Sequence, residues 1–161
     1  MIKKVLVLAI VLLSTIMPSA VATPLQRPVI VVLNESKAFT FTQYSILYQY
    51  LNEVAKYWDI YQGVYWIHLR DSLPKKIVFP KGAIGGHVPN AVTYIDIKST
   101  LDMKLDPYYV ITHELAEMAV DPNNNRYSTN GKLIEVCDGL NQYFLLGNHQ
   151  VSAFLKPTDY L

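Results

Sequence analysis

One stretch decides the fold and the candidate site: Val110-Ile111-Thr112-His113-Glu114-Leu115-Ala116-Glu117-Met118-Ala119-Val120-Asp121. His113 and Glu117 are four residues apart, so on a helix their Cβ atoms lie roughly 5–6 Å apart on one face. That distance would let both side chains hold one metal ion. A different face of the same helix carries three apolar residues at helical spacing, which we expect in the core: Ile111, Leu115 and Met118.

The ends of this helix are also marked in the sequence. Asp106 is a favourable N-cap, Pro107 suits the first helical position, and Pro122 ends the helix after Asp121. Several acidic groups and a histidine then lie together on an otherwise apolar helix. Because unpaired buried charges are costly, we expect this polar face to line a cleft. The alternative is a helix face exposed to solvent.

The segment from His113 to Glu117 resembles the H-E-x-x-H motif of metallopeptidases. In that motif two helical side chains hold zinc, and the intervening glutamate is the general base. Glu117 replaces the second histidine here, and carboxylates also bind zinc. The resemblance therefore implies that Glu114 is the base.

Length and composition limit the remaining possibilities. The chain has 161 residues, of which 51% are hydrophobic and 17% charged, as expected for one globular domain with a core. The net charge is +1 and no basic stripe is present, so we expect no nucleic-acid partner.

The first 22 residues have the pattern of a secretory signal peptide. A basic start is followed by an apolar run, Val5 to Met17, and by Ala20-Val21-Ala22 before Thr23. The run is shorter than the roughly 20 apolar residues that a membrane span needs. We therefore predict a signal peptide over residues 1–22 and one domain over 23–161, secreted, at the cell surface, in the periplasm or on a virion. An uncleaved N-terminal anchor is the alternative.

The patterns after Thr23 predict an α+β domain in which helices pack on a mixed sheet. The sequence predicts strands over 29–33, 64–69, 77–79 and 91–97, a long amphipathic helix over 42–59, and a glycine-bearing loop over 81–90. After the motif helix it predicts a strand or turn over 132–136 and a hairpin of 144–146 with 151–155. This C-terminal part would form the far wall of the cleft.

Cys137 is the only cysteine of the chain and can form no internal disulfide. It lies between Glu135 and Asp138, and negative neighbours raise the pKa of a thiol. We therefore expect a buried small residue and not a nucleophile.

The loop after the motif helix partly matches a calcium-binding loop. Asp121, Asn123 and Asn125 match the first positions of an EF-hand loop. Arg126 and Lys132 stand where that loop needs Gly and Glu, which argues against an EF-hand. A different calcium site that uses Asp121 and loop oxygens remains an alternative to zinc.

Glu135 follows Glu117 by 18 residues, a spacing that resembles the gluzincin peptidases. That resemblance implies that Glu135 is the third zinc ligand and that Asp138 orients His113 by a hydrogen bond, as metal-bound histidines generally require. Asp121 would be a further acidic neighbour of the ligands. Ordinary surface acids are the alternative interpretation of Glu135 and Asp138.

Four short segments resemble a family of mostly uncharacterised phage, prophage and bacterial proteins: His-Glu-Leu-Ala-Glu-Met-Ala-Val-Asp-Pro at 113–122, Glu-Val-Cys-Asp at 135–138, Gly-Gly-His at 85–87 and Val-Ser-Ala-Phe at 151–154. The resemblance covers residues 82–157 and implies a zincin-like domain with a metal site. The family pattern has an acid after the loop histidine, where this chain has Val88. His87 itself is then either a fourth ligand, a group that stabilises an oxyanion, or a solvated turn residue.

These patterns together lead to two expectations of function. The first is an exported zincin-like enzyme, a peptidase or amide hydrolase, in which His113, Glu117 and Glu135 hold Zn²⁺ and Glu114 is the general base on a peptide or protein substrate. Two anionic ligands, however, weaken the Lewis acidity of the ion. The second expectation is therefore a structural metal centre in a surface, virion or assembly protein, which would bind assembly partners.

Overall fold

The computed structural model describes residues 27–129, 131–138, 140 and 142–160. The predicted signal peptide, residues 1–22, lies outside this part of the chain. In the part that is described, every helix is too short or too polar to cross a membrane.

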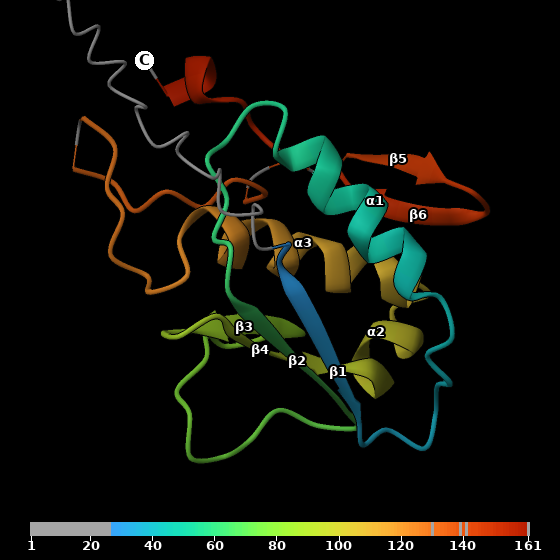
Figure 1. Cartoon of the computed structure of the whole chain (residues 1–161). Helices are drawn as coiled ribbons and strands as arrows, with labels where there is room; N and C mark the ends of the chain where they lie inside the picture. The colour runs from blue at the N-terminus through green and yellow to red at the C-terminus, as the bar shows by residue number, and fades with distance from the viewer. Residues whose placement is uncertain (1–26, 130, 139, 141, 161) are drawn as a thin grey trace, which may run out of the picture.

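Four strands form a mixed sheet in the order β1-β2-β4-β3 (Figure 1). β1 (Val29–Asn34), β2 (Val64–Arg70) and β4 (Val92–Asp96) are parallel neighbours, and β3 (Gly85–Val88) pairs antiparallel with β4 at the end of the sheet. Parallel neighbours need a long crossover connection, and α1 (Tyr44–Val54) lies in the connection between β1 and β2. The α+β class and the mixed sheet are as the sequence predicts.

Helix α3 (Pro107–Val120) carries the motif and lies between the sheet and α1 in Figure 1. Its start is as predicted, because the Asp106 carboxylate accepts a hydrogen bond from the backbone N–H of Tyr108 at 2.9 Å and Pro107 occupies the first turn. α3 contacts α1, β3, β4 and the C-terminal strand β6. The three residues predicted for its core face are fully buried: Ile111, Leu115 and Met118.

Between β2 and α3 the structure contradicts two predictions and contains one helix that was not predicted. Residues 77–79 form no strand, and Val78 is 97% exposed, so its β-branched side chain has no core to face. The predicted loop over 81–90 contains β3, whose Gly85 and Gly86 gave no strand signal. The short helix α2 (Ile97–Asp102) follows β4 directly and was not predicted.

The long helix predicted over 42–59 is real but shorter, since α1 ends at Val54. Residues 132–136 are irregular and form only an isolated bridge between Tyr127 and Leu133. The C-terminal hairpin is confirmed with shifted limits: β5 (Tyr143–Leu146) pairs with β6 (His149–Ser152), so His149 is on a strand and not in the turn. A 3-10 turn, η1 (Pro157–Tyr160), follows.

The hairpin is fastened to α3 by a buried hydrogen bond. The backbone N–H of Ser152 on β6 donates to the Thr112 hydroxyl at 2.9 Å. Close by, the N–H of Leu155 donates to the Val136 carbonyl at 2.7 Å. These two bonds hold the irregular segment around residues 135–138 beside the motif helix.

Candidate metal centre

A cavity of about 610 Å³ lies between β3, one face of α3 and the segment 135–138 with Leu140. Three α3 residues line it: His113, Glu114 and Glu117. Glu114 and Glu117 are only 6% and 4% exposed. The predicted cleft is therefore present, and the alternative of a solvent-exposed helix face is wrong.

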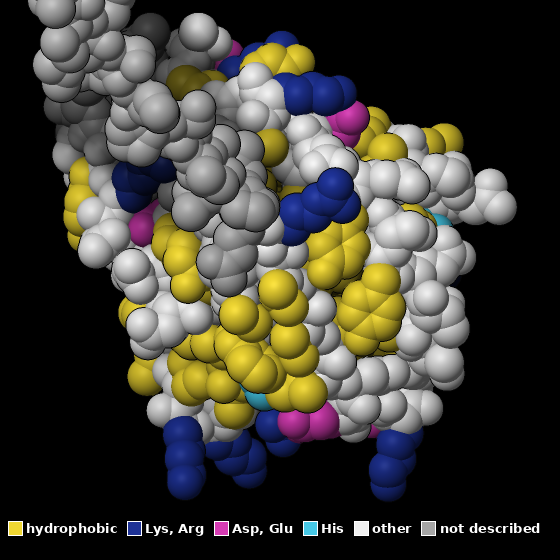
Figure 2. Space-filling model, viewed as in Figure 1, with side chains coloured by type: hydrophobic (Ala, Val, Ile, Leu, Met, Phe, Trp, Pro, Cys, Tyr) yellow, Lys and Arg dark blue, Asp and Glu magenta, His cyan; other side chains and the backbone are white. Residues whose placement is uncertain are grey.

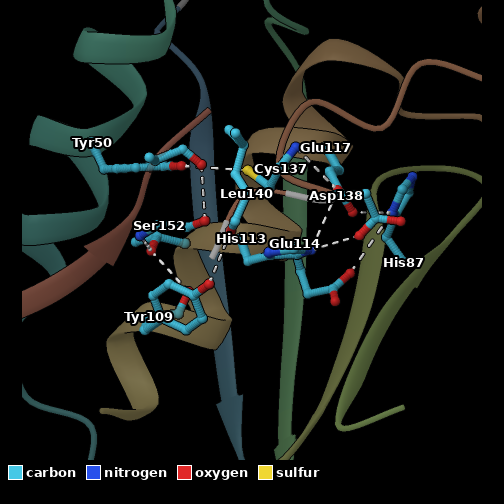
Figure 3. Close-up of polar contacts among 12 residues, drawn as sticks. Tyr50, His87, Tyr109, His113, Glu114, Glu117, Cys137, Asp138, Leu140 and Ser152 are labelled. Atoms are coloured by element: carbon cyan, nitrogen blue, oxygen red, sulfur yellow. Dashed lines mark hydrogen bonds and ion pairs between the residues drawn. The ribbon is translucent and has the colours of Figure 1, made fainter. Parts of the chain in front are cut away.

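Glu117 lies between two histidines (Figure 3). Its Oε1 atom is 3.3 Å from His113 Nε2, and its Oε2 atom is 3.8 Å from His87 Nδ1. The i, i+4 spacing on α3 thus brings His113 and Glu117 together as the sequence predicts. The contact with His87 comes from a different element, the edge strand β3.

His87 is buried beside Glu114. Its side chain is 4% exposed, so it is not a solvated turn residue, and its Nδ1 atom is 3.8 Å from Glu114 Oε2. His87 Nε2 is also buried and has no hydrogen-bond partner among the described residues. A buried imidazole nitrogen without a partner is costly, so a ligand or substrate atom at this position would be stabilising.

Gly85 allows β3 to lie this close to α3. A Cβ atom on Gly85 would be 2.8 Å from Glu114 Oε1 and 3.2 Å from a methyl group of Val110. The absence of a side chain at residue 85 therefore leaves room for the Glu114 carboxylate.

Asp138 contacts His113 as predicted, but at an unexpected atom. Its Oδ1 is 3.3 Å from His113 Nε2, the same ring nitrogen that faces Glu117. A residue that orients a ligand normally holds the other ring nitrogen. The side chain of Asp138 is 69% exposed, so it reaches His113 from the solvent side of the cavity.

Glu135 and Asp121, the other predicted acids, have different positions. Glu135 lines the cavity and is half-buried. Asp121 does not line the cavity, and its two carboxylate oxygens accept hydrogen bonds from the backbone N–H groups of Asn125 and Arg126 at 3.0 and 2.8 Å. Asp121 thus shapes the loop after α3.

Among the described residues, two groups of side chains could hold a metal ion, and they share Glu117. One consists of His113, Glu117 and Cys137, and the other of His87, Glu114 and Glu117; within each group the ligand atoms lie within 4.8 Å of one another. Glu135, the predicted third ligand, is in neither group. The sequence prediction that Cys137 is buried is confirmed, but its nearness to His113 and Glu117 was missed, because spacing along an irregular segment does not predict direction.

The clustered charges shift the pKa values of these groups. Burial alone lowers the pKa of His113, but hydrogen bonds to Asp138 and Glu117 outweigh it and raise the value to about 11. For His87, burial is likewise outweighed by Glu114 and the other carboxylates, so its pKa is raised. Burial raises the pKa of Glu114, and burial together with Glu117 raises that of Glu135 to about 7. A site with so many acids favours a bound cation.

The chain matches no family model, no curated protein and no solved structure. The chemistry of the site therefore has to be inferred from its own residues. Those residues include two groups of His, Glu and Cys side chains that could hold a metal ion.

Proposed function

We propose that this protein is an exported zinc-dependent hydrolase that cleaves peptide or related amide bonds. The observation that carries the proposal is the buried Glu114, which lies in the same cavity as His113 and Glu117. It belongs to the group of possible ligands around His87 and not to the group that His113 forms with Glu117. A carboxylate beside a metal site, close to it but not required as a ligand, is the arrangement that base catalysis needs.

The donor set supports zinc. Imidazole nitrogen, carboxylate oxygen and thiol sulfur are the zinc ligands of proteins, whereas calcium takes oxygen ligands almost alone. His113 and Glu117 would hold the ion, with a third donor from the segment 135–138. Asp121, which a calcium site would need, has both carboxylate oxygens engaged with backbone N–H groups.

Each residue near this centre has a chemical role in the proposed reaction. Bound zinc would lower the pKa of a water molecule toward about 7 and polarise the scissile carbonyl. Glu114 accepts a proton from the water and passes it to the leaving amine. His87 lies beside Glu114, and the surrounding carboxylates raise its pKa; it donates a hydrogen bond to the oxygen on which negative charge develops.

The edge strand supports a peptide substrate. β3 is the terminal strand of the sheet, and its residues line the cavity beside Glu114. An extended peptide can add to such an edge through main-chain hydrogen bonds, which would place its carbonyl groups along the site. A preference for peptides over small amides follows from this arrangement.

The test is the Glu114→Gln variant of the mature chain, the predicted domain over residues 23–161. It is assayed for zinc content and for cleavage of a fluorogenic peptide library. We expect full zinc content and no cleavage, because the change removes a proton acceptor but no ligand. The matched control is Glu53→Gln on the outer face of α1, which should keep both. Loss of zinc from Glu114→Gln as complete as from His113→Ala would make Glu114 a ligand and overturn its assignment as the base.

A second candidate function, an assembly protein with a structural metal, is favoured by one observation. Hydrophobic side chains gather on the face of the molecule over β1 and β2 (Figure 2), and four of them are exposed: Val29, Leu33, Val64 and Trp66. Large exposed apolar patches are typical of contact surfaces. If zinc-loaded protein cleaves no peptide and wild type and Glu114→Gln behave alike, this candidate replaces the first.

A further inference from the structure

Cys137 lies at the metal centre and not merely in the core. It is fully buried and lines the cavity, and its Sγ atom is within 4.8 Å of the ligand atoms of His113 and Glu117. Figure 3 shows the sulfur between Tyr50 and the Glu117 carboxylate. The thiol thus belongs to one group of converging donor atoms with the two side chains that α3 fixes.

We propose that the Cys137 thiolate, together with His113 and Glu117, binds the metal ion. This inference rests on the proposed metal centre and names its third ligand. The thiol loses its proton when the ion binds, since the thiolate is the form that binds metals, and the proton is released to solvent.

The backbone around Cys137 supports this role. The N–H of Cys137 donates to Glu117 Oε1 at 3.3 Å, the same oxygen that faces His113 Nε2. One residue therefore supplies a sulfur ligand and also orients the neighbouring carboxylate ligand. A hydrogen bond of this kind behind a ligand is a usual feature of protein metal sites.

The other side of the sulfur is polar as well. The buried Tyr50 hydroxyl lies 3.8 Å from Cys137 Sγ. The hydroxyl pairs with the thiol in the metal-free protein, and it could donate a hydrogen bond to the thiolate of a metal-bound Cys137. Alanine at residue 137 would fill a core position without these contacts.

Glu135 is the alternative third ligand, and its position fits less well. It lines the cavity but does not belong to either group of converging ligand atoms. A long side chain in an irregular segment would have to turn toward His113, whereas Cys137 Sγ is already in place. Glu135 would then contribute negative charge near the ion and not a bond.

A thiolate ligand also determines which ions the site prefers. Soft sulfur donors favour zinc and disfavour calcium and magnesium, which bind hard oxygen ligands. With Cys137 bound, the centre should select zinc or cobalt even where calcium is abundant. An all-carboxylate site on the same helix would lack that discrimination.

Cobalt spectroscopy of the mature chain tests the proposal directly. Cobalt(II) bound at a zinc site gives visible d–d bands, and a thiolate ligand adds a near-ultraviolet charge-transfer band. Because Cys137 is the only cysteine, that band can arise from no other residue. We expect both features in wild type, and we expect zinc to displace them and to protect the thiol from a thiol-specific reagent.

Two variants separate Cys137 from Glu135. Cys137→Ser should lose the charge-transfer band, and its zinc affinity should fall by more than the roughly 10- to 100-fold that loss of a residue behind a ligand costs. Glu135→Gln should keep the band and most of the affinity. If Cys137→Ser fails to fold, the band and the thiol protection in wild type still decide the question.

The possible failures are distinguishable. Visible d–d bands without a charge-transfer band, with a thiol as reactive in the presence of zinc as in its absence, would overturn the role of Cys137 and leave the proposed metal centre intact. The absence of cobalt and zinc binding altogether would overturn both the ligand and the proposed function.

Discussion

His113 must lose a proton before it can bind a metal ion, and its neighbours oppose that loss. Asp138 and Glu117 both contact Nε2 and raise the His113 pKa to about 11, against about 6.5 for an isolated histidine. In the metal-free protein the charged His113 therefore contributes stability below about pH 6.5, which is lost as pH rises through about 11. Protons and metal ions compete for this side chain over that whole window.

We predict from this competition that the apparent zinc affinity of the protein rises steadily from about pH 6 to about pH 9. An unperturbed histidine would give a plateau above about pH 7.5. Competition with a chromophoric chelator at several pH values measures the affinity. Asp138→Asn weakens the hydrogen bond that contributes most to the raised pKa, so the affinity of this variant should level off at lower pH. A plateau near neutral pH in wild type would contradict the prediction.

At the scale of single elements, the contact of β3 with α3 depends on a residue without a side chain. A Cβ atom on Gly85 would displace the Glu114 carboxylate, the flexible end of which can move aside. We predict that Gly85→Ala folds and keeps its zinc but loses most of its hydrolytic activity, because the base is moved from its place. Activity per zinc-loaded molecule is the measurement.

Gly86→Ala is the matched control for that change. It adds the same methyl group to the next residue of β3, where the group would meet the Phe79 ring and not Glu114. Its activity per folded molecule should exceed that of Gly85→Ala. If both variants lost the same activity, the cause would be a general disturbance of β3 and not displacement of Glu114. In the Glu114→Gln background, Gly85→Ala should have no additional effect.

The elements that sequence patterns predict well are those in which local signals agree. α3 has an N-cap at Asp106, a proline in its first turn and Pro122 beyond its end, and its limits follow from these to within one residue. The three residues predicted for its core face are buried, but so is most of the rest of the helix. β3 has only four residues, two of them glycine, and is a strand because β4 pairs with it. No local pattern could reveal it.

The candidate site divides in the same way. The pairing of His113 with Glu117 follows from helix geometry alone, and the structure confirms it. The approach of His87 depends on the pairing of β3 with β4, and that of Cys137 depends on the path of an irregular segment held by the hairpin. Both are long-range consequences of the fold, so spacing in the sequence suggested a loop histidine and a core cysteine.

At the scale of the whole molecule, the cavity lies at the interface between two parts of the chain. Helix α3 supplies one wall, and the segment 135–138 with Leu140 supplies another. Buried apolar contacts hold the two parts together, as do buried hydrogen bonds such as that of Ser152 N–H with Thr112. Four carboxylates meet there, and burial with mutual repulsion raises the pKa of Glu135 to about 7. Because the pKa is raised from about 4.5, the metal-free fold loses stability as the pH rises from about 4.5 to about 7.

A bound metal ion would offset the repulsion between these carboxylates, and its bonds to both walls of the cavity would stabilise the fold. We predict that zinc raises the free energy of unfolding by RT ln(1 + [L]/Kd), about 2.7 kcal/mol at a hundredfold excess over Kd, and that a chelator removes the gain. Thermal melts with zinc, with calcium and with chelator measure it. His113→Ala should abolish the zinc shift, whereas His68→Ala, on β2 beside Glu35 and outside the cavity, should keep it. A rise in melting temperature with calcium alone would indicate a site made of oxygen ligands. No rise with any ion would mean that the cluster binds no metal and that protons balance its negative charges.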